Sequence, residues 1–464
     1  MVAFEVRLNE EFERGLRSSL RENQISVSPA DLRTFAVDQG PVTDYQEPAA
    51  VVWAESVADV QAVVRLAAAH SVPVVARGAG TGVSGGAHAT AGCVVLDLER
   101  MNKILELNPE DEIARVEPGV VNADLNSAAA VHGLMYAPDP ASYKISTIGG
   151  NVATNAGGLR CAKYGVTRDA VLALDVVLAD GELIHTGHRT FKGVAGYDLT
   201  SLFVGSEGTL GIVVGATVRL KYLPVDVRTL AVFFPDVASA AAGVLVLGAK
   251  RVQPCILEML DGASLVELDS HHGTDLSQRG NALLLAQFDG LAAAMEADIA
   301  AEALAALGGS VNREDPAEAE RLVELRRNNR GLDVDSDITV GEDVAVPRSQ
   351  LVHYIAALEE MAARHGVGVR IIAHAGDGNL HPTFWVPESE AAAVAALNAA
   401  LDESIDKALE LGGTITGEHG IGQYKLKWLP LEQAESVLQL QRRIKDLFDP
   451  QGILNPGKAI TSRP

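Results

Sequence analysis

Two histidines near the C-terminal end have the residue type and spacing of a metal site. His374 and His381 flank an Asp377-Gly378 pair in the stretch HAGDGNLH. An Asp-Gly pair between apolar runs is typical of a two-residue β-hairpin turn. With these two residues in the turn, positions 374 and 381 pair directly across the hairpin, where two imidazoles can share one cation. A different turn register would change that pairing.

A second cluster, Gly417-Glu418-His419-Gly420, follows closer to the C-terminus. Glu418 would complete a His/His/Glu ligand set with His374 and His381, a combination compatible with zinc or manganese that leaves positions open for a substrate. For any one histidine, a hydrogen-bonded structural role is the simpler interpretation. The metal hypothesis therefore depends on the two clusters taken together, and on a family resemblance described below.

The segment 80–85, GTGVSG, matches the pattern G-x-G-x-x-G and follows an apolar run that favours a strand. In a dinucleotide-binding fold the third glycine opens a helix, but here GAHATAG leads into another strand-like run at 93–96. A nicotinamide site is therefore not indicated. Consecutive unhindered N–H groups can still surround phosphate oxygens without a helix, and an ordinary glycine turn is the alternative.

Two more loops rich in small residues follow, at 138–158 and 205–212. In this order the three loops resemble those of flavoenzymes with the vanillyl-alcohol-oxidase type of FAD domain. The resemblance is to the branch that contains D-lactate dehydrogenases, the glycolate oxidase flavin subunit and D-2-hydroxyglutarate dehydrogenases, and it extends over nearly the whole chain. It implies an α+β protein in which a two-part FAD domain carries a cap domain built on an antiparallel sheet.

The resemblance also implies which residues bind FAD. The loop 77–82 would hold the pyrophosphate, and the other two loops would contact the ribityl, adenine and isoalloxazine parts. Members with covalently bound flavin often have a histidine in the first loop, where this chain has Thr81, so we expect non-covalent FAD. The predicted contacts, including Asn455 in a C-terminal return to the flavin, are Arg77, Gly78, Ala79, Gly80, Thr81, Gly82, Pro138, Asp139, Ser142, Thr147, Gly149, Gly150, Asn151, Asn155, Gly157, Gly158, Glu207, Gly208, Gly211, Ile212 and Asn455.

In the metal-using branch of the family, the residues that match His374, His381 and Glu418 are the ligands, and the one that matches His419 contacts the substrate. Oxidation of a 2-hydroxy acid removes a hydroxyl proton and moves a hydride from the α-carbon to flavin. A bound cation would lower the pKa of that hydroxyl, and His419 is the candidate general base. Arg326 falls where the family carries an arginine for the substrate carboxylate, a group that its fork can bind.

One departure from the family bears on the substrate. D-2-hydroxyglutarate dehydrogenases have a lysine for the distal carboxylate where this chain has Gly341. D-lactate, glycolate or a larger apolar 2-hydroxy acid is therefore preferred, with D-2-hydroxyglutarate as the alternative. Two further alternatives are a metal-dependent hydrolase, which would be colourless, and a non-catalytic FAD subunit. The sequence does not identify the electron acceptor among oxygen, a quinone, a cytochrome and an electron-transfer flavoprotein.

The helices and strands predicted to position these residues follow one pattern up to residue 224 and another after it. Up to residue 224, a helical N-terminal extension (1–45) precedes a strand at 50–53, a helix at 57–69 and a strand at 72–76, and then short strands alternate with glycine loops over 113–220. Ser56 is the predicted N-cap of the helix, and Asp59 stands in the capping-box position. The resulting domain prediction is 1–224 for the extension and FAD domain, 225–425 for the cap, and 426–464 for a returning helical segment.

After 224 the pattern changes to strands followed by alanine-rich helices. The segments 229–248 and 282–308 are weakly similar and indicate antiparallel strands. They are followed by a predicted helix at 348–365, strands over 368–386, a helix at 388–411 and a helical tail at 427–448.

Composition limits the partners. The chain has 464 residues, 47% of them hydrophobic, and 38 Lys+Arg against 61 Asp+Glu give a net charge of −23. Such a charge disfavours nucleic acid and anionic membranes. Three widely spaced cysteines indicate a reducing compartment. No secretory apolar core is evident, and Pro235-Asp236 interrupts the most apolar stretch. We expect a cytoplasmic protein with no membrane span, and a homodimer is left open.

Overall fold

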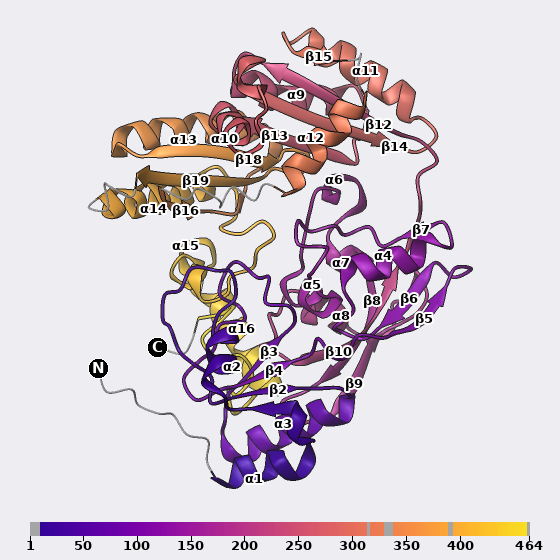
Figure 1. Ribbon diagram of the computed structural model, residues 1–464, viewed down its shortest axis with the longest axis vertical. Helices are drawn as coiled ribbons and strands as arrows, with labels where there is room; N and C mark the ends of the chain where they lie inside the picture. Colours follow the sequence, from indigo (N-terminus) through magenta and orange to yellow (C-terminus); the bar gives the residue numbers. More distant parts are fainter. Residues whose placement is uncertain (1–9, 313–315, 329–336, 388–392, 462–464) are drawn as a thin grey trace. The chain divides into compact units, whose positions relative to one another are not determined.

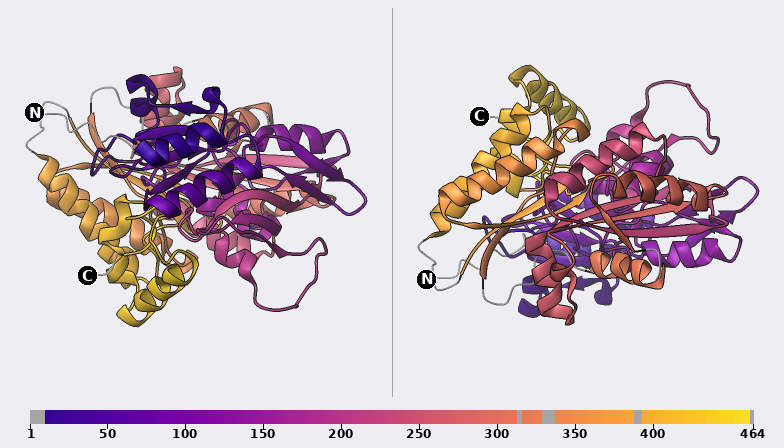
Figure 2. Two further views of the ribbon diagram at one scale, coloured as in Figure 1. Left: turned by 90° about the horizontal axis from the view of Figure 1, so that it is seen from below. Right: turned by 90° about the horizontal axis from the view of Figure 1, so that it is seen from above.

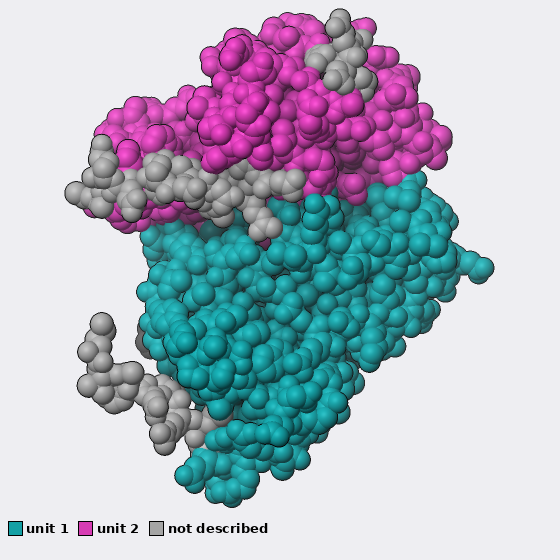
Figure 3. All heavy atoms as spheres, in the orientation of Figure 1, with its two compact units in different colours: residues 1–156, 166–223, 419–464 teal, residues 157–165, 224–418 magenta. Residues whose placement is uncertain are grey.

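The computed structural model describes residues 10–312, 316–328, 337–387 and 393–461, and the chain divides into two compact units (Figure 3). Unit 1 comprises residues 1–156, 166–223 and 419–464, and unit 2 comprises 157–165 and 224–418. The chain thus passes between units at 223/224, whereas the return falls at 418/419 and not at the expected 425/426. The short segment 157–165, expected in the FAD domain, packs with unit 2.

The first part of unit 1 is a four-stranded sheet of order β1-β2-β4-β3. Its strands are β1 (Ile25–Ser26), β2 (Ala50–Trp53), β3 (Val74–Arg77) and β4 (Val94–Asp97), of which the last three run parallel. Helix α3 (Val57–His70) connects β2 to β3, as predicted, and α1 (Glu10–Ser19) packs along it (Figures 1 and 2). A short helix, α2 (Pro29–Thr34), precedes β2.

The N-cap of α3 differs slightly from the prediction. The Ser56 hydroxyl accepts a hydrogen bond from the Asp59 N–H, as expected for a cap. The Asp59 carboxylate, however, accepts from the N–H of Glu55 and not from that of Ser56. Two reciprocal side-chain hydrogen bonds therefore cap the start of the helix. They differ from a capping box in that Asp59 bonds to the residue before the N-cap and not to the N-cap itself.

The second part of unit 1 is an antiparallel sheet of order β5-β6-β10-β8-β9. Strand β10 occupies the centre of this sheet. The remaining elements of unit 1 are β5 (Ile104–Asn108), β6 (Ile113–Val116), α4 (Asn122–Ala130), β7 (Leu134–Met135), α5 (Ile148–Thr154), α7 (Thr167–Ala170), β8 (Val171–Val177), β9 (Leu183–Gly187), α8 (Leu199–Phe203), β10 (Ile212–Arg219), β11 (Lys221–Tyr222), α15 (Leu429–Glu432) and α16 (Glu435–Phe448).

Unit 2 is built on one antiparallel sheet of order β15-β12-β14-β13-β18-β19-β16, with β17 also paired to β19. The two predicted strand–helix repeats are present as β12 with α9 and β14 with α11, and the two strands pair antiparallel. The elements are α6 (Cys161–Tyr164), β12 (Val227–Phe234), α9 (Val237–Ala249), β13 (Ile256–Asp261), α10 (Gly262–His272), β14 (Ala282–Asp289), α11 (Ala293–Ala305), β15 (Ser310–Asn312), α12 (Pro316–Asn328), β16 (Asp337–Gly341), β17 (Val344–Ala345), α13 (Leu351–His365), β18 (Gly368–His374), β19 (Asn379–Pro387) and α14 (Val394–Glu410).

The α+β class predicted from sequence is confirmed by these elements. The predicted helix at 388–411 corresponds to α14, and its first residues, 388–392, lie outside the described part of the chain. Among the described residues, no helix combines the length and apolar character needed to cross a membrane.

The register predicted for the hairpin of β18 and β19 is wrong. His374 pairs with Asn379, and His381 pairs with Ile372. The turn contains four residues, 375–378, and not two, and it closes through Gly378 at a φ of +87°. Because 372 and 374 share a face, the two histidines remain on one side of the sheet as diagonal neighbours.

Candidate functional site

The three predicted metal ligands lie together within unit 2. His374 Nε2 is 3.1 Å and His381 Nε2 is 3.4 Å from the same oxygen, Glu418 Oε1. The two imidazole rings stand edge to face, with centroids 5.1 Å apart. One ligand atom from each residue lies within 4.8 Å of the others. Since zinc–nitrogen and zinc–oxygen bonds are about 2 Å long, these atoms can converge on one cation after small side-chain shifts.

Electrostatics in the ligand set favour a positive charge between the side chains. Burial alone would lower the pKa of His374, but the charges of Glu258 and Glu418 outweigh it and raise that pKa well above its usual value. Burial would likewise raise the pKa of Glu418, but His374 holds it well below its usual value. A cation bound here would replace a proton, so its affinity must fall as the pH falls.

Glu258 is a functional candidate that sequence reasoning missed. It lies on β13 directly opposite His374 on β18, and its side chain is fully buried. Its Oε1 is 2.6 Å from His374 Nδ1, the position at which a carboxylate orients a metal-binding histidine. The available signal was a lone charged residue within the apolar run preceding Asp261.

Arg326 reaches the same carboxylate from α12. Its Nε lies 2.8 Å from Glu258 Oε2, and only 4% of the residue is exposed. Arg326 is therefore not a solvated helix charge. The adjacent Arg327 is also buried, but its Nε lies 3.6 Å from Glu324, a residue of its own helix. Arg326 is thus joined to the candidate ligand set through Glu258.

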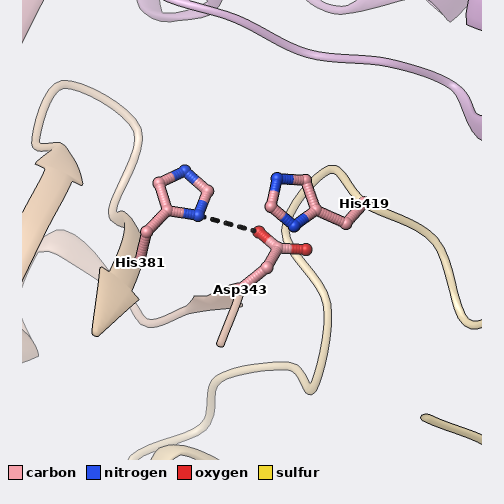
Figure 4. Close-up of side chains that lie close together, drawn as sticks. All are labelled: Asp343, His381 and His419. Carbon is pink, nitrogen blue, oxygen red and sulfur yellow. Dashed lines mark ion pairs between the residues drawn. The ribbon is translucent and has the colours of Figure 1, made fainter. Parts of the chain in front are cut away.

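Asp343, another residue that sequence reasoning missed, holds the segment before the candidate ligand Glu418. Its Oδ2 accepts hydrogen bonds from the Thr416 hydroxyl at 2.8 Å and from the N–H groups of Gly417 at 3.0 Å and Glu418 at 3.1 Å. Its Oδ1 forms a longer ion pair, 3.8 Å, with His381 Nδ1 (Figure 4). The fully buried carboxylate therefore fixes the backbone from which Glu418 projects.

His419, the candidate base, follows Glu418 directly and begins the part of the chain that belongs to unit 1. There a second buried carboxylate fixes the backbone. Glu207 accepts from the N–H groups of Ile421 and Gly422, each at 2.8 Å. Burial raises the pKa of Glu207 to about 7 although these two donors favour the ionised form. Within unit 1, Glu207 thus fixes the backbone that follows His419.

The first flavin loop has the features of an anion cradle within unit 1. The N–H groups of residues 78–82 donate to no acceptor among the described residues. Gly80 has a φ of +64°, and a Cβ on Gly78 would lie 2.3 Å from Thr147 Oγ1. Successive N–H groups beside glycines can surround phosphate oxygens, and only glycine permits these approaches.

Two buried polar atoms near the second loop also lack a partner within the described structure, namely Ser146 Oγ and Asn151 Nδ2. Buried polar atoms are normally hydrogen-bonded, so each indicates a group that the protein itself does not supply. Thr147 caps α5 by accepting from the Gly150 N–H. The unpartnered atoms and the cradle at 78–82 fit a long ligand with phosphate and polar ring groups, as FAD is.

The C-terminal return reaches these loops. Asn455 Nδ2 donates to Gly86 O at 2.9 Å and to Glu207 O at 2.7 Å, and its Oδ1 accepts from Lys458 Nζ. Burial lowers the pKa of Lys458 to about 8. Asn455 therefore ties the end of the first loop to the third. Its predicted contact with the flavin ring stays a prediction.

Two details of the predicted flavin loops change. The stretch 138–158 is not loop throughout, because 148–154 form α5. Gly157 and Gly158 fall in unit 2, unlike the other predicted flavin residues. A Cβ on Gly157 would lie 2.3 Å from Glu418 Oε2, so this glycine leaves room for a proposed metal ligand.

Comparison with known protein families and sequences identifies relatives over most of the chain. Residues 48–187 match a family model described as an FAD binding domain, and residues 223–459 match the C-terminal domain of FAD linked oxidases. The glycolate oxidase subunit GlcD of Bacillus subtilis is 40% identical over 437 residues, 93% of each chain. A D-lactate dehydrogenase of Archaeoglobus fulgidus is 37% identical over 406 residues, 87% of this chain and 89% of that one.

Solved structures show the same fold at low sequence identity. The structure of p-cresol methylhydroxylase with substrate bound has a TM-score of 0.78 and 20% identity, and the match covers 98% of this chain and 97% of that chain. The 4-ethylphenol oxidase from Gulosibacter chungangensis has a TM-score of 0.75 and 21% identity, with 98% of each chain covered.

Proposed function

The chain belongs to the FAD-linked oxidase family, and on this premise we propose that it oxidises a D-2-hydroxy acid, of the D-lactate or glycolate type, to the 2-oxo acid. The observation that carries the proposal is the convergence of His374, His381 and Glu418 in a chain that also has flavin loops. Relatives named glycolate oxidase subunit and D-lactate dehydrogenase support the substrate class.

The proposed site divides the chemistry between bound groups and side chains. When bound, FAD would accept a hydride from the substrate α-carbon, and a divalent cation, zinc or manganese, would lower the pKa of the substrate hydroxyl. His374, His381 and Glu418 would hold the cation. His419 takes the hydroxyl proton at an imidazole nitrogen. Arg326 binds the substrate carboxylate and so sets which face of the α-carbon is presented.

The flavin site in this proposal uses backbone more than side chains. The N–H groups of 78–82 would receive the pyrophosphate, and Ser146 and Asn151 would supply polar partners to the rest of the cofactor; both sets lack partners among the described residues. Thr81 stands where a covalent histidine would be needed, so the flavin is dissociable. A protein stripped of FAD by acid or high salt should regain its yellow colour on addition of FAD.

The residue at position 341 favours a small acid as the substrate. Gly341 ends β16 and offers no side-chain cation for a second carboxylate. We therefore expect D-lactate and glycolate to be better substrates than D-2-hydroxyglutarate.

Anaerobic bleaching of the flavin tests the proposal. D-lactate, glycolate, D-2-hydroxyglutarate and the L-isomers are each mixed with the purified yellow protein, and oxidised flavin is followed by its absorption. We expect rapid bleaching by D-lactate or glycolate and slow bleaching by L-lactate. If none of these acids bleaches the flavin, the proposed activity is wrong.

A further inference from the structure

The buried carboxylate of Glu258 contacts two residues with different proposed roles. Its Oε1 is hydrogen-bonded to Nδ1 of the proposed ligand His374 at 2.6 Å, and its Oε2 lies 2.8 Å from Nε of Arg326. The three residues come from β13, β18 and α12 of unit 2, three elements grouped in Figure 1. One fully buried group therefore joins the metal set to the arginine proposed for the substrate.

We propose that Arg326 is a positioning residue for the metal as well as a substrate ligand, and that it acts on His374 through Glu258. The proposal rests on the metal site of the preceding subsection. It assigns Arg326 an effect on a cation that it does not touch.

The first step of the argument is geometric. An ionised carboxylate can only accept hydrogen bonds, so His374 must carry its proton on Nδ1 and present Nε2 to the cation. The cross-strand pairing of 258 with 374 fixes the side chains on one face and limits how far the carboxylate can turn. Glu258 thus selects the tautomer that a metal ligand needs.

The second step concerns charge. A buried carboxylate is costly unless it is paired, and removal of one partner from a buried pair leaves the other charge uncompensated. Arg326 supplies the countercharge and holds the second oxygen. Without Arg326, Glu258 would reorient or change its hydrogen bonding, and the imidazole of His374 would lose its fixed direction.

The Zn²⁺ affinity of the purified flavoprotein tests whether Arg326 acts on His374 through Glu258. The affinity for Zn²⁺ is measured by competition with a chelator in the natural protein, Glu258→Gln, Arg326→Gln and the double variant. We expect each single variant to bind Zn²⁺ about 10- to 100-fold more weakly, the range for loss of a carboxylate behind a histidine ligand. We expect the double variant to be no weaker than the weaker single variant, since both act through one contact.

A matched control is available in the same unit. Glu267 on α10 forms a similar buried pair with Nε of Arg370 on β18, at 3.2 Å, outside the ligand set. Glu267→Gln and Arg370→Gln should leave the Zn²⁺ affinity unchanged. Flavin content and the unfolding midpoint report whether each variant is folded.

Two further measurements separate positioning from general damage. Co²⁺ in place of Zn²⁺ gives a visible absorption spectrum that reports the ligand geometry, and we expect Arg326→Gln to alter it. Arg326→Lys keeps a positive charge, so its loss of Zn²⁺ affinity should be smaller than that of Arg326→Gln. If Glu258→Gln does not fold, the comparison of these two Arg326 variants tests the proposal.

The outcomes distinguish this proposal from the proposed function. If the natural protein binds Zn²⁺ but Arg326→Gln binds it equally well, the coupling through Glu258 is wrong and the metal site stands. If the natural protein binds neither Zn²⁺ nor Mn²⁺, the metal site itself is wrong and the coupling is overturned with it. Additive losses in the double variant would also contradict a single shared contact.

Discussion

The candidate flavin loops of unit 1 and the candidate metal set of unit 2 are built in opposite ways. The first offers backbone N–H groups that glycines leave accessible. The space around these glycines limits which side chains can replace them, as at Gly78, where an added Cβ would collide with Thr147. The second offers side chains, and Glu258 and Asp343 each hold one part of it by hydrogen bonds. A backbone-built site should therefore fail when volume is added, and a side-chain-built site when charge or direction is changed.

The buried acids of the two units also differ, in the direction in which their pKa values are shifted. Glu258 and Glu418 have their pKa values lowered because His374 outweighs the effect of burial. Asp97 and Glu207 in unit 1 have their pKa values raised to about 7 because burial prevails. Paired carboxylates with lowered pKa values thus organise the candidate metal set, whereas burial brings the pKa values of the two unit 1 acids close to neutral pH.

The largest expected effect comes from added volume at Gly78. In Gly78→Val, the new Cβ would lie 2.3 Å from Thr147 Oγ1 and separate the first two loops. We expect the variant to lose bound FAD and with it all measurable turnover, because the hydride then has no acceptor. The flavin-to-protein absorbance ratio measures the loss.

The control for this variant is Gly133→Asn. Gly133 also belongs to unit 1 and has a φ of +70°, but no atom lies within 4 Å of its added Cβ. Asparagine tolerates that conformation, so the flavin should be retained. The comparison between the sites would fail if Gly78→Val kept its flavin, or if it lost its Zn²⁺ affinity to the same degree.

The next effect is on the metal set, through Asp343. Asp343→Asn keeps the size of the side chain but removes its charge and places a donor where an acceptor served three groups. We expect the Zn²⁺ affinity to fall about 10- to 100-fold because the backbone of Glu418 is no longer fixed. The flavin content should not change.

Asp269 provides the matching control. Its carboxylate accepts from the Thr274 hydroxyl and from the N–H groups of Leu276 and Ser277, so it holds a loop of unit 2 by the same kind of contacts. Asp269→Asn should destabilise that loop without altering Zn²⁺ affinity. Equal losses in both variants would mean that Asp343 acts only on general stability.

Helix α3 could be predicted from a local pattern, because the Ser56 cap and the apolar spacing lie within one short segment. The three candidate flavin loops are far apart in the sequence and were assigned through the family resemblance, so their contacts with FAD stay a prediction. The histidine register was missed because it depends on whether the turn has two residues or four, which Asp377-Gly378 alone does not determine.

Glu258 and Asp343 were missed for a different reason. Glu258 lies 116 residues from its partner His374 in the sequence, and Asp343 lies 75 residues from Glu418. The role of Glu258 depends on the pairing of β13 with β18, and that of Asp343 depends on its hydrogen bonds to residues 416–418. Neither contact can be recognised from a short sequence motif. A lone charged residue in an apolar strand is the one local sign that Glu258 offered.

The smallest expected effect concerns pH and sharpens the contrast between the buried acids. Asp97, at the end of β4, is fully buried, and its Oδ2 has no hydrogen-bond partner among the described residues. Burial, with the nearby charge of Glu99, raises its pKa to about 7 from 3.8. The folded protein therefore binds this proton more tightly than the unfolded chain, so stability falls as the pH rises from about 4 to about 7.

Asp97→Asn removes this dependence because the amide cannot ionise. Relative to the natural protein, the variant should gain stability between pH 5 and pH 8, by on the order of 2 kcal/mol, since each pKa unit corresponds to about 1.4 kcal/mol. Unfolding midpoints of the flavoprotein at the two pH values measure the gain. Glu207 shifts in the same direction, so part of the decline should persist in the variant. If the unfolding midpoints of the two proteins change equally between pH 5 and pH 8, the pKa of Asp97 is not raised by burial. The contrast between the acids of the two units would then not include Asp97.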